Sequence, residues 1–487
     1  MTIFPHIYKG CVDFLVQPLT CLFGKSIESS IFPNVLKRSV ITPIFKTGDK
    51  SQIRNYRPIS VLNSIAKIFE TIIYVNIFDE FQSEFAPQQH GFLPDRSTTT
   101  NLLLFSQSAA EAINNKQQLD TIMTDCAKAF DKMNHKILLE RLGMLGFSQH
   151  ALQFMKSYLS DRQQRVKVGQ SLSHEISVTS GVPQGSNLGH LLFTIFINDL
   201  PKVLTYSSCL LFADDFKLFK SISSLDDCGK LQCDLDAVCR WFDRSRLCLN
   251  IDKCYVMTFT RKVSYINGSY NTAHEELVRK PICKDLGVYF ENDLKFNVHY
   301  EHIVNKAYRL LGFVIRNTKF FRNIDTIIKL YNALVRPHLE YASVVWSPQA
   351  ETNINLIEKV QKRFLRYLYF RKYKNYPFMI SYRSMLKDFK IVSLQSRRSL
   401  QSVLFVYFIV NDLKYRGLQL INYIKISVPK MNLRMLDNKT FYIDYADCSP
   451  FRKMMEQSNL FLRVCNIDLY VVNKTKEIKE THFLLQQ

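Results

Sequence analysis

Two adjacent acidic residues, Asp214 and Asp215, lie between two apolar runs, and this pattern constrains the fold more than any other feature of the sequence. The runs, residues 209–212 and 216–219, are typical of two short strands, which places the acids at the turn between them. Adjacent carboxylates repel each other unless a cation lies beside them or solvent surrounds them. The pattern therefore predicts a β-hairpin whose tip either binds a cation or is open to water.

A third acid, Asp125, ends residues 119–125, whose centre is apolar, and precedes residues 127–130, which form a good helix opening. An acid at a strand end beside an acid pair in a hairpin would provide three oxygen ligands. Carboxylate oxygens suit Mg²⁺, and two such ions stabilise the attacking and leaving oxygens of nucleotidyl transfer. Spacing alone, however, favours the alternative that these are unrelated turn acids.

The chain carries a net charge of +21, from 64 Lys and Arg against 43 Asp and Glu, and 47% of its residues are apolar. This apolar content excludes a disordered polycation and predicts a globular protein with a polyanionic partner. Residues 301–400 contain 19 basic and 6 acidic side chains, so most of the excess lies in about one fifth of the chain. We therefore expect a distinct basic module that binds the partner.

Hydrophobic periodicity predicts a mixed α/β body followed by helices. Residues 148–160 start with a capping Ser and carry one apolar face, which predicts a helix. Residues 165–178 alternate as in a β-hairpin. Three helical patterns follow at residues 303–314, 327–334 and 357–368.

The third of these helices has a basic stripe opposite its apolar face. A solvated face is the usual meaning of such a stripe, but this one lies in the charge-rich segment, which favours contact with phosphates. The residues of this predicted nucleic-acid-binding stripe are Lys359, Lys362, Arg363 and Arg366.

The twelve cysteines are scattered, without a Cys-x-x-Cys pair, and most lie in apolar runs. They are typical of reduced, buried thiols in an intracellular protein. The N-terminus lacks a charged region followed by a long apolar stretch, and no window reaches the roughly 18 apolar residues of a membrane span. We expect a soluble, intracellular protein of the nucleus, the cytoplasm or both, without a membrane partner; its oligomeric state stays open.

Residues 212–215, Phe-Ala-Asp-Asp, resemble the catalytic loop of reverse transcriptases, in particular those of jockey-like non-LTR retrotransposons. Further blocks of this family follow in the expected order, and the resemblance covers roughly residues 30–370. The similar blocks are residue 46 with residues 54–60, then 89–92, 96–98, 125–131, 181–186, 249–254 and 284–288, and beyond the polymerase 334–341 and 344–348.

The resemblance implies an α+β right-hand polymerase with fingers, a palm built on an antiparallel sheet, and a helical thumb. The endonuclease that full elements of this family carry upstream is expected to be missing. The expected domains are an N-terminal extension over residues 1–29, fingers over 30–115, palm over 116–290, thumb over 291–375 and a basic, helix-rich C-terminal region over 376–487.

The resemblance also implies the activity, that of an RNA-directed DNA polymerase. Such a nucleotidyltransferase adds dNTPs to the 3′ end of a DNA primer on an RNA template and serves retrotransposition. Asp125 and Asp214 would bind two Mg²⁺ ions, with Mn²⁺ as an alternative, and Asp215 would be the supporting carboxylate. The main-chain carbonyl of Cys126 would be a further metal ligand.

The nucleotide pocket is implied in the same way. Lys46 and Arg57 would hold the triphosphate, and Gln184 with Gly185 would line the pocket. Phe130 stands where the family has an aromatic gate against a 2′-hydroxyl; the competing interpretation is a core Phe on a helix. Lys253 would protonate pyrophosphate, although an exposed Lys near a turn is more often only solvated.

Some residues depart from the family pattern. Leu-Pro-Asp at residues 93–95 places an acid near the template path, Cys-Ala at residues 126–127 replaces an aromatic and a Ser, and His190 replaces a Pro. None of these is one of the three acids. They support an alternative, a catalytically decayed or domesticated remnant that only binds nucleic acid. A structural protein with coincidental acids is a second alternative, which the ordered motifs disfavour.

Overall fold

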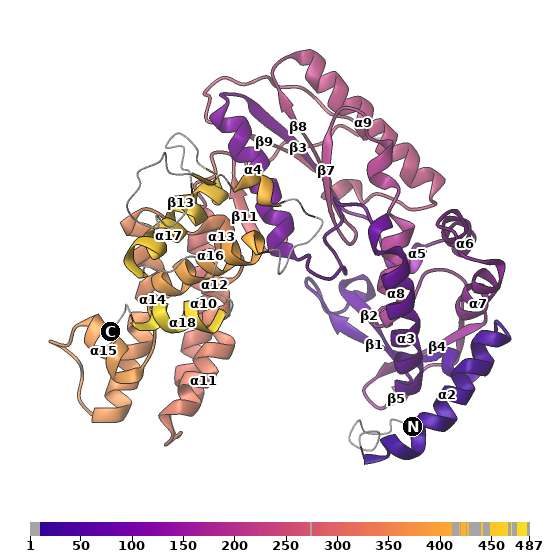
Figure 1. The fold of residues 1–487 in the computed structure, drawn as a ribbon, viewed down its shortest axis with the longest axis horizontal. Coiled ribbons are helices and arrows are strands. Elements are labelled where there is room, and N and C mark those ends of the chain that lie inside the picture. Colours follow the sequence, from indigo (N-terminus) through magenta and orange to yellow (C-terminus); the bar gives the residue numbers. More distant parts are fainter. Residues whose placement is uncertain are drawn as a thin grey trace, which may run out of the picture.

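The structure is a computed structural model of the chain, and it describes residues 10–272, 275–411, 418, 420–424, 426–427, 440–441, 449–465, 469 and 475–484. Residues 1–9 of the expected N-terminal extension and the other positions of the expected C-terminal region lie outside the described residues. Figure 1 shows two arms joined by the sheet that contains β3 and β8. One arm contains β1, β2 and α3, and the other contains the helices from α10 onward.

The central sheet is antiparallel, with the strand order β7-β8-β3-β9. Its neighbouring side chains alternate between two hydrophobic cores. Leu210 and Phe219 belong to one core, whereas Leu211 and Leu218 belong to the other. Both faces are therefore buried, and the sheet is the middle layer. The strands are β3 (Gln118–Thr124), β7 (Ser208–Phe212), β8 (Asp215–Ile222) and β9 (Tyr255–Phe259).

Helices cover both faces of this sheet. Helix α4 (Thr98–Asn114) packs against β3, β7 and β9 and shares the core of Leu210. Helices α8 (Asn187–Phe196) and α9 (Leu225–Arg244) contribute to the opposite core. Further helices on that side are α5 (Ala129–Lys132), α6 (His135–Met144) and α7 (Gln149–Leu159). The helix predicted over residues 148–160 is confirmed by α7, whose amide of Ala151 donates to the capping Ser148 hydroxyl.

A second sheet forms the arm that contains the expected fingers. Strands β1 (Arg38–Phe45) and β2 (Tyr56–Leu62) pair antiparallel, and α3 (Ser64–Phe81) follows them. The hairpin predicted over residues 165–178 is confirmed, but it extends this sheet, because its first strand pairs parallel with β1. The sheet thus combines segments from both sides of the expected boundary at residue 115. The added strands are β4 (Arg162–Val168), β5 (Ser171–Leu172) and β6 (Ile176–Val178), and the arm begins with α2 (Val12–Glu28).

The other arm is helical. A small hairpin, β10 (Ile282–Asp285) and β11 (Val288–Glu291), leads into it. The three predicted helices are confirmed by α10 (Asn297–Asn317), α11 (Ile324–Leu334) and α14 (Glu351–Tyr373). The remaining helices are α12 (Arg336–Glu340), α13 (Ser343–Trp346), α15 (Tyr382–Phe389), α16 (Leu394–Val410), α17 (Pro450–Cys465) and α18 (Thr475–Leu484), and β12 (Ile426–Ser427) pairs with β13 (Thr440–Phe441).

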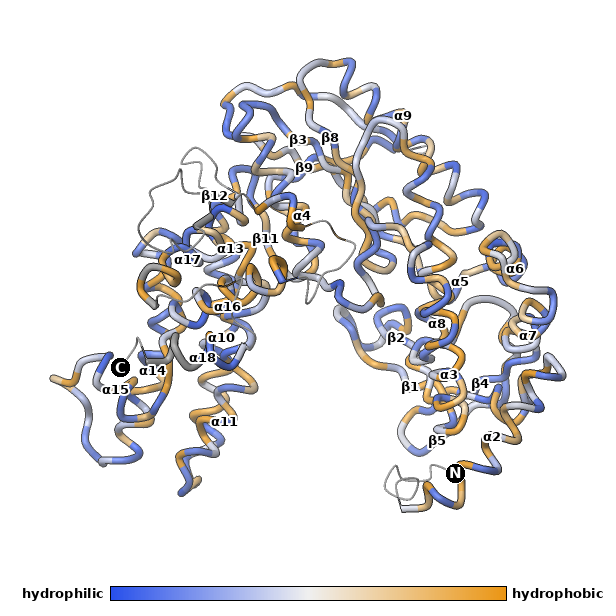
Figure 2. Tube along the Cα trace, in the orientation of Figure 1, coloured by the Kyte–Doolittle hydropathy of each residue, from blue (hydrophilic) through white to orange (hydrophobic). Residues whose placement is uncertain are grey.

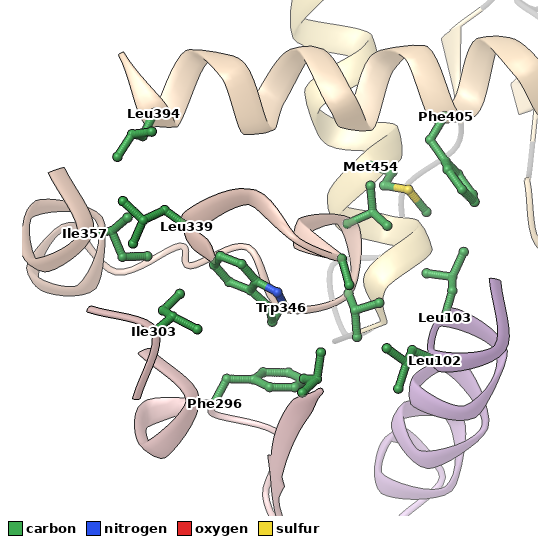
Figure 3. Close-up of a cluster of buried hydrophobic side chains, with 14 of the residues drawn as sticks. Leu102, Leu103, Phe296, Ile303, Leu339, Trp346, Ile357, Leu394, Phe405 and Met454 are labelled. Atoms are coloured by element: carbon green, nitrogen blue, oxygen red, sulfur yellow. The ribbon is translucent and has the colours of Figure 1, made fainter. Parts of the chain in front are cut away.

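The C-terminal helices share one core with the helices of the expected thumb and with α4. Figure 3 shows Trp346 among side chains of several elements, including Leu103 of α4, Ile303 of α10, Phe405 of α16 and Met454 of α17. Trp346 is fully buried, and its indole N–H donates to the carbonyl oxygen of Tyr341 at 2.8 Å. The described helices of the C-terminal region are therefore part of the arm's own core.

Some interior helices carry a largely apolar stretch. Figure 2 shows such a stretch along α8, which is only 10 residues long. Within the described parts of the chain, no helix combines the length and the apolar character needed to cross a bilayer.

Candidate active site

The two adjacent acids lie at the tip of the β7–β8 hairpin, as their pattern predicts. Phe212 pairs with Asp215, so Ala213 and Asp214 form a two-residue turn. Ala213 adopts a left-handed backbone with a φ of 55°. Asp214 therefore projects from the turn itself, and Asp215 is the first residue of β8.

Asp125 joins them because of the register of β3. Thr124, the last residue of β3, pairs with Phe216, so Asp125 lies across from Asp215. Burial and the nearby Asp125 charge raise the pKa of Asp214. Burial, Asp214, Asp285 and Asp125 raise the pKa of Asp215 to about 6, although its side chain stays open to solvent on one side. The three predicted carboxylates therefore lie within electrostatic range of one another.

Basic and amide side chains reach Asp125 from the segment before β9. The Lys253 ammonium donates to Oδ2 of Asp125 at 2.8 Å, and the Asn250 side-chain amide donates to the same oxygen at 3.3 Å. Lys253 thus lies at the site, where it neutralises a carboxylate. In the described part of the molecule, no three His, Cys, Asp or Glu side chains are already grouped as a metal site.

The carbonyl oxygen of Cys126 accepts neither of the two hydrogen bonds that form the β-bridge of this residue. Cys126 faces Leu249 in an isolated antiparallel bridge. This bridge has two hydrogen bonds: the Asn250 amide donates to the Asp125 carbonyl, and the Ala127 amide donates to the Cys248 carbonyl. Burial first, and then Asp214 and Asp125, raise the pKa of the Cys126 thiol to about 12, so this side chain is a neutral thiol at neutral pH.

Lys46 and Arg57 lie on one face of the β1–β2 hairpin. Arg57 pairs with Ile44, and Lys46 follows two residues after Ile44, so both basic side chains share that face. Both are exposed, and both oppose the rise of the Asp214 pKa. The structure therefore brings these two predicted residues within electrostatic range of the acids.

Gln184 and Gly185 connect the palm to the second sheet. The side-chain amide of Gln184 donates to Oδ1 of Asp131 at 3.0 Å, and its carbonyl accepts from the Ser60 amide at 2.7 Å. Gly185 has a φ of +118°, and a Cβ there would lie 2.7 Å from the Ser60 carbonyl oxygen. The small size of Gly185 is therefore required by β2, and Gln184 is held beside Asp131.

Phe130 is held in a cluster of rings. It stacks on Phe193 with ring centroids 4.3 Å apart, and its edge meets Phe92 at 5.9 Å. His190, one of the departures from the family pattern, lies 4.3 Å from Phe92 and 5.8 Å from Phe130. Phe130 is only half-buried, so the ring is fixed on one side and retains exposed surface on the other.

Gln89 and Gly91 hold the β7–β8 turn, a role that sequence reasoning missed. The side-chain oxygen of Gln89 accepts from the amides of Gly91 at 2.7 Å and Ala213 at 3.1 Å. A Cβ on Gly91 would lie 2.3 Å from the Ala213 nitrogen. The only sequence signal for these contacts was the resemblance of residues 89–92 to a family block, which does not reveal what they touch.

A buried ion pair beside Asp215 was also missed. Lys217 of β8 pairs with Asp285 of β10, and both side chains are almost fully buried. The Lys217 ammonium also lies 4.7 Å from the centroid of the Phe105 ring. A cavity of about 490 Å³ between the central sheet and the β10–β11 hairpin is lined by Asp125, Asp215 and this pair. Asp125 and Asp215 therefore open onto a space that can receive a ligand.

The four predicted basic residues of α14 line one groove on the helical arm. Its volume is about 780 Å³, and Tyr308, Tyr367 and Phe370 lie among the cations. The Arg363 guanidinium lies 5.7 Å from the Tyr308 ring centroid. Aromatic rings between cations suit contacts with nucleic acid. The groove residues from the prediction are Lys359, Lys362, Arg363 and Arg366.

Comparisons with known proteins match most of the chain. The family model described as "Reverse transcriptase (RNA-dependent DNA polymerase)" matches residues 44–315. The chain is 27% identical over 398 residues to the RNA-directed DNA polymerase from mobile element jockey of Drosophila melanogaster, covering 78% of this chain and 42% of that protein. It is 29% identical over 397 residues to the jockey polymerase of Drosophila funebris, covering 77% and 41%.

A further relative is the probable RNA-directed DNA polymerase from transposon BS of Drosophila melanogaster, 28% identical over 72% of this chain and 40% of that protein. The chain thus spans about two fifths of the length of these curated relatives. Among solved structures, apo telomerase from Candida tropicalis matches 69% of this chain and 62% of its own, with 13% identity and a TM-score of 0.38.

Proposed function

This chain belongs to the reverse transcriptase family, and we propose that it is an RNA-directed DNA polymerase that extends a DNA primer with dNTPs on an RNA template. The observation that carries the proposal is that Asp125, Asp214 and Asp215 lie within electrostatic range of one another, with Asp125 and Asp215 lining the cavity beside β10. As in the relatives named for mobile elements, the polymerase would serve retrotransposition.

The acids fit a divalent cation site by their charge and chemistry. Asp214 and Asp215 have raised pKa values partly because neighbouring carboxylates repel them, and a cation would relieve this repulsion. Carboxylate oxygens and the Cys126 carbonyl are the hard ligands that Mg²⁺ or Mn²⁺ prefers. Reverse transcriptases generally use divalent metal ions. When bound, two such ions stabilise the attacking 3′-oxygen and the departing pyrophosphate.

The chain's own residues would bind and orient the substrates. We assign the triphosphate to Lys46 and Arg57, which are exposed and already act on the charge of Asp214. Gln184 is assigned to the nucleotide pocket, since Asp131 fixes its side chain. Lys253, whose ammonium donates to Asp125, would protonate the departing pyrophosphate.

Replacing Phe130 by Ala is expected to relax discrimination against ribonucleotides. The half-exposed ring would stand against a 2′-hydroxyl, and its removal opens that space. Removal of such a steric barrier corresponds to a change of about 10–200-fold in the ratio of kcat/KM values for dNTP and NTP. Phe193→Leu, which alters the same ring cluster behind Phe130, is the matched control. Unchanged discrimination in Phe130→Ala would indicate that Phe130 is a core residue and not a gate.

Removing the basic groove residues is expected to weaken duplex binding and its salt dependence together. The change is Lys359→Gln, Arg363→Gln and Arg366→Gln in one variant. For each phosphate that the variant no longer neutralises, the slope of log K against log salt falls by about 0.7–0.9. The measurement is a salt titration of template–primer binding, with Lys230→Gln on the exposed face of α9 as the control. Weaker binding with the wild-type slope would contradict phosphate binding in this groove.

Primer extension on poly-rA with an annealed oligo-dT tests the proposal. The purified chain is expected to extend the primer with dTTP in Mg²⁺, and duplex binding is measured on the same preparation. Binding without extension would favour the nucleic-acid-binding remnant over the polymerase.

A further inference from the structure

Arg398 is a buried cation with unsatisfied donors. The residue lies on α16 inside the helical arm and is only 2% exposed. Its Nε and Nη1 atoms have no hydrogen-bond partner among the residues that the structure describes. A guanidinium remains charged at any physiological pH, and burying its donors without hydrogen bonds is strongly unfavourable. The fold therefore maintains an incompletely satisfied positive charge at this position.

The nearest carboxylates are engaged elsewhere. Glu340 forms ion pairs with Arg397 and Arg336. Glu358 accepts from the Gln395 amide at 2.6 Å and from the Tyr382 hydroxyl. The carboxylates of Glu340 and Glu358 affect the pKa of Arg398 only through longer-range electrostatics. Arg398 therefore has no salt-bridge partner in the described part of the arm.

Arg398 lines a cavity of about 340 Å³. One wall is the segment after Trp346, which the sequence pattern singles out and the polymerase site does not use. The opposite walls are α16 and α17. The polar residues that line the cavity with Arg398 include Ser347, Ser399, Ser402, Lys453 and Gln457. The lining therefore combines two cationic side chains with hydroxyl and carboxamide groups.

We propose that this cavity binds a phosphate group through the guanidinium of Arg398, two of whose donors, Nε and Nη1, have no partner in the described part of the chain. A guanidinium presents its donors in a fork that matches two oxygens of an oxyanion, and hydroxyls can donate to the remaining oxygens. The phosphate is either free inorganic phosphate or the end of a nucleic acid chain. The residues that line this cavity are all different from those that line the cavity of the carboxylates, so its ligand is separate from the incoming nucleotide.

Thermal melting of the full chain tests the site. Inorganic phosphate is expected to raise the melting temperature of the wild type by about 2–4 °C relative to chloride at equal ionic strength. Arg398→Met should abolish this rise, and without phosphate it should melt no lower than the wild type, because a buried cation with unsatisfied donors is gone. The surface variant Lys230→Met removes the same charge from α9 and should retain the rise.

A second variant tests the same cavity in case Arg398→Met does not fold. Ser399→Leu keeps Arg398 and fills part of the cavity, and it should also abolish the phosphate response. Competition by a 5′-phosphorylated RNA tetramer, but not by its 5′-hydroxyl form, would assign the site to a nucleic acid end; absence of competition would assign it to free phosphate. A wild type without the rise, or a rise retained in both cavity variants, would overturn the proposal.

Discussion

Replacing Asp214 by Asn is expected to abolish primer extension and leave template–primer binding intact. Asp214 forms the tip of the β7–β8 turn and lies against the Asp125 charge. The amide keeps the size of the side chain but removes the negative charge that would hold a cation at the 3′-oxygen. Removal of one such electrostatic interaction lowers the rate by about 10²–10³-fold. Single-turnover extension and duplex binding, measured on the same preparation, check this expectation.

Asp226→Asn is the matched control, because it makes the same chemical change on the exposed first turn of α9. This variant should extend primers at the wild-type rate. Wild-type activity in Asp214→Asn would refute the assignment of the acids. Loss of duplex binding together with activity would instead point to a displaced hairpin.

Replacing Lys217 by Met is expected to destabilise the chain by about 3–5 kcal/mol. The variant leaves Asp285 buried without its cation, beside an Asp215 whose pKa is already raised by that carboxylate. The substitution also removes the ammonium that lies over the Phe105 ring. The measurement is the urea midpoint of unfolding, read by far-ultraviolet circular dichroism, together with the melting temperature.

The double variant Lys217→Met with Asp285→Leu removes both charges and is the control for this effect. Much of the missing stability should return, because an apolar pair can replace a buried ion pair at little cost. A single variant as stable as the wild type would show that the Lys217–Asp285 pair does not hold β10 on the central sheet. A double variant no better than the single one would assign the destabilisation to packing.

The β7–β8 hairpin was predictable because its signals are local. Two apolar runs around Asp214 and Asp215 specify it. Asp125 was joined to this pair only by the resemblance, since spacing alone favoured unrelated turn acids. The helices α10, α11 and α14 were predictable for the same reason, since amphipathic periodicity is written within each segment. The basic stripe on α14 followed from that periodicity, and its residues do line one groove.

The remaining features depend on pairs of segments far apart in the chain. No local pattern reveals that β4 pairs with β1, that Gln89 holds the amide of Ala213, or that Asp285 neutralises Lys217. Arg398 is similar: an Arg on a helix is usually exposed, and only the packing of α16 against the Trp346 core buries it. The resemblance to reverse transcriptases identified the blocks, whereas the folded chain gives their contacts.

Single-nucleotide incorporation on a mixed-sequence RNA template is the sharpest test of the polymerase assignment. A labelled DNA primer is annealed to the RNA, and each of the four dNTPs is offered alone with Mg²⁺ to the purified chain. We expect addition of the one dNTP complementary to the first template base, and no addition with Asp214→Asn. A chain that binds this duplex but adds no nucleotide, or adds all four equally, would refute templated synthesis by these acids.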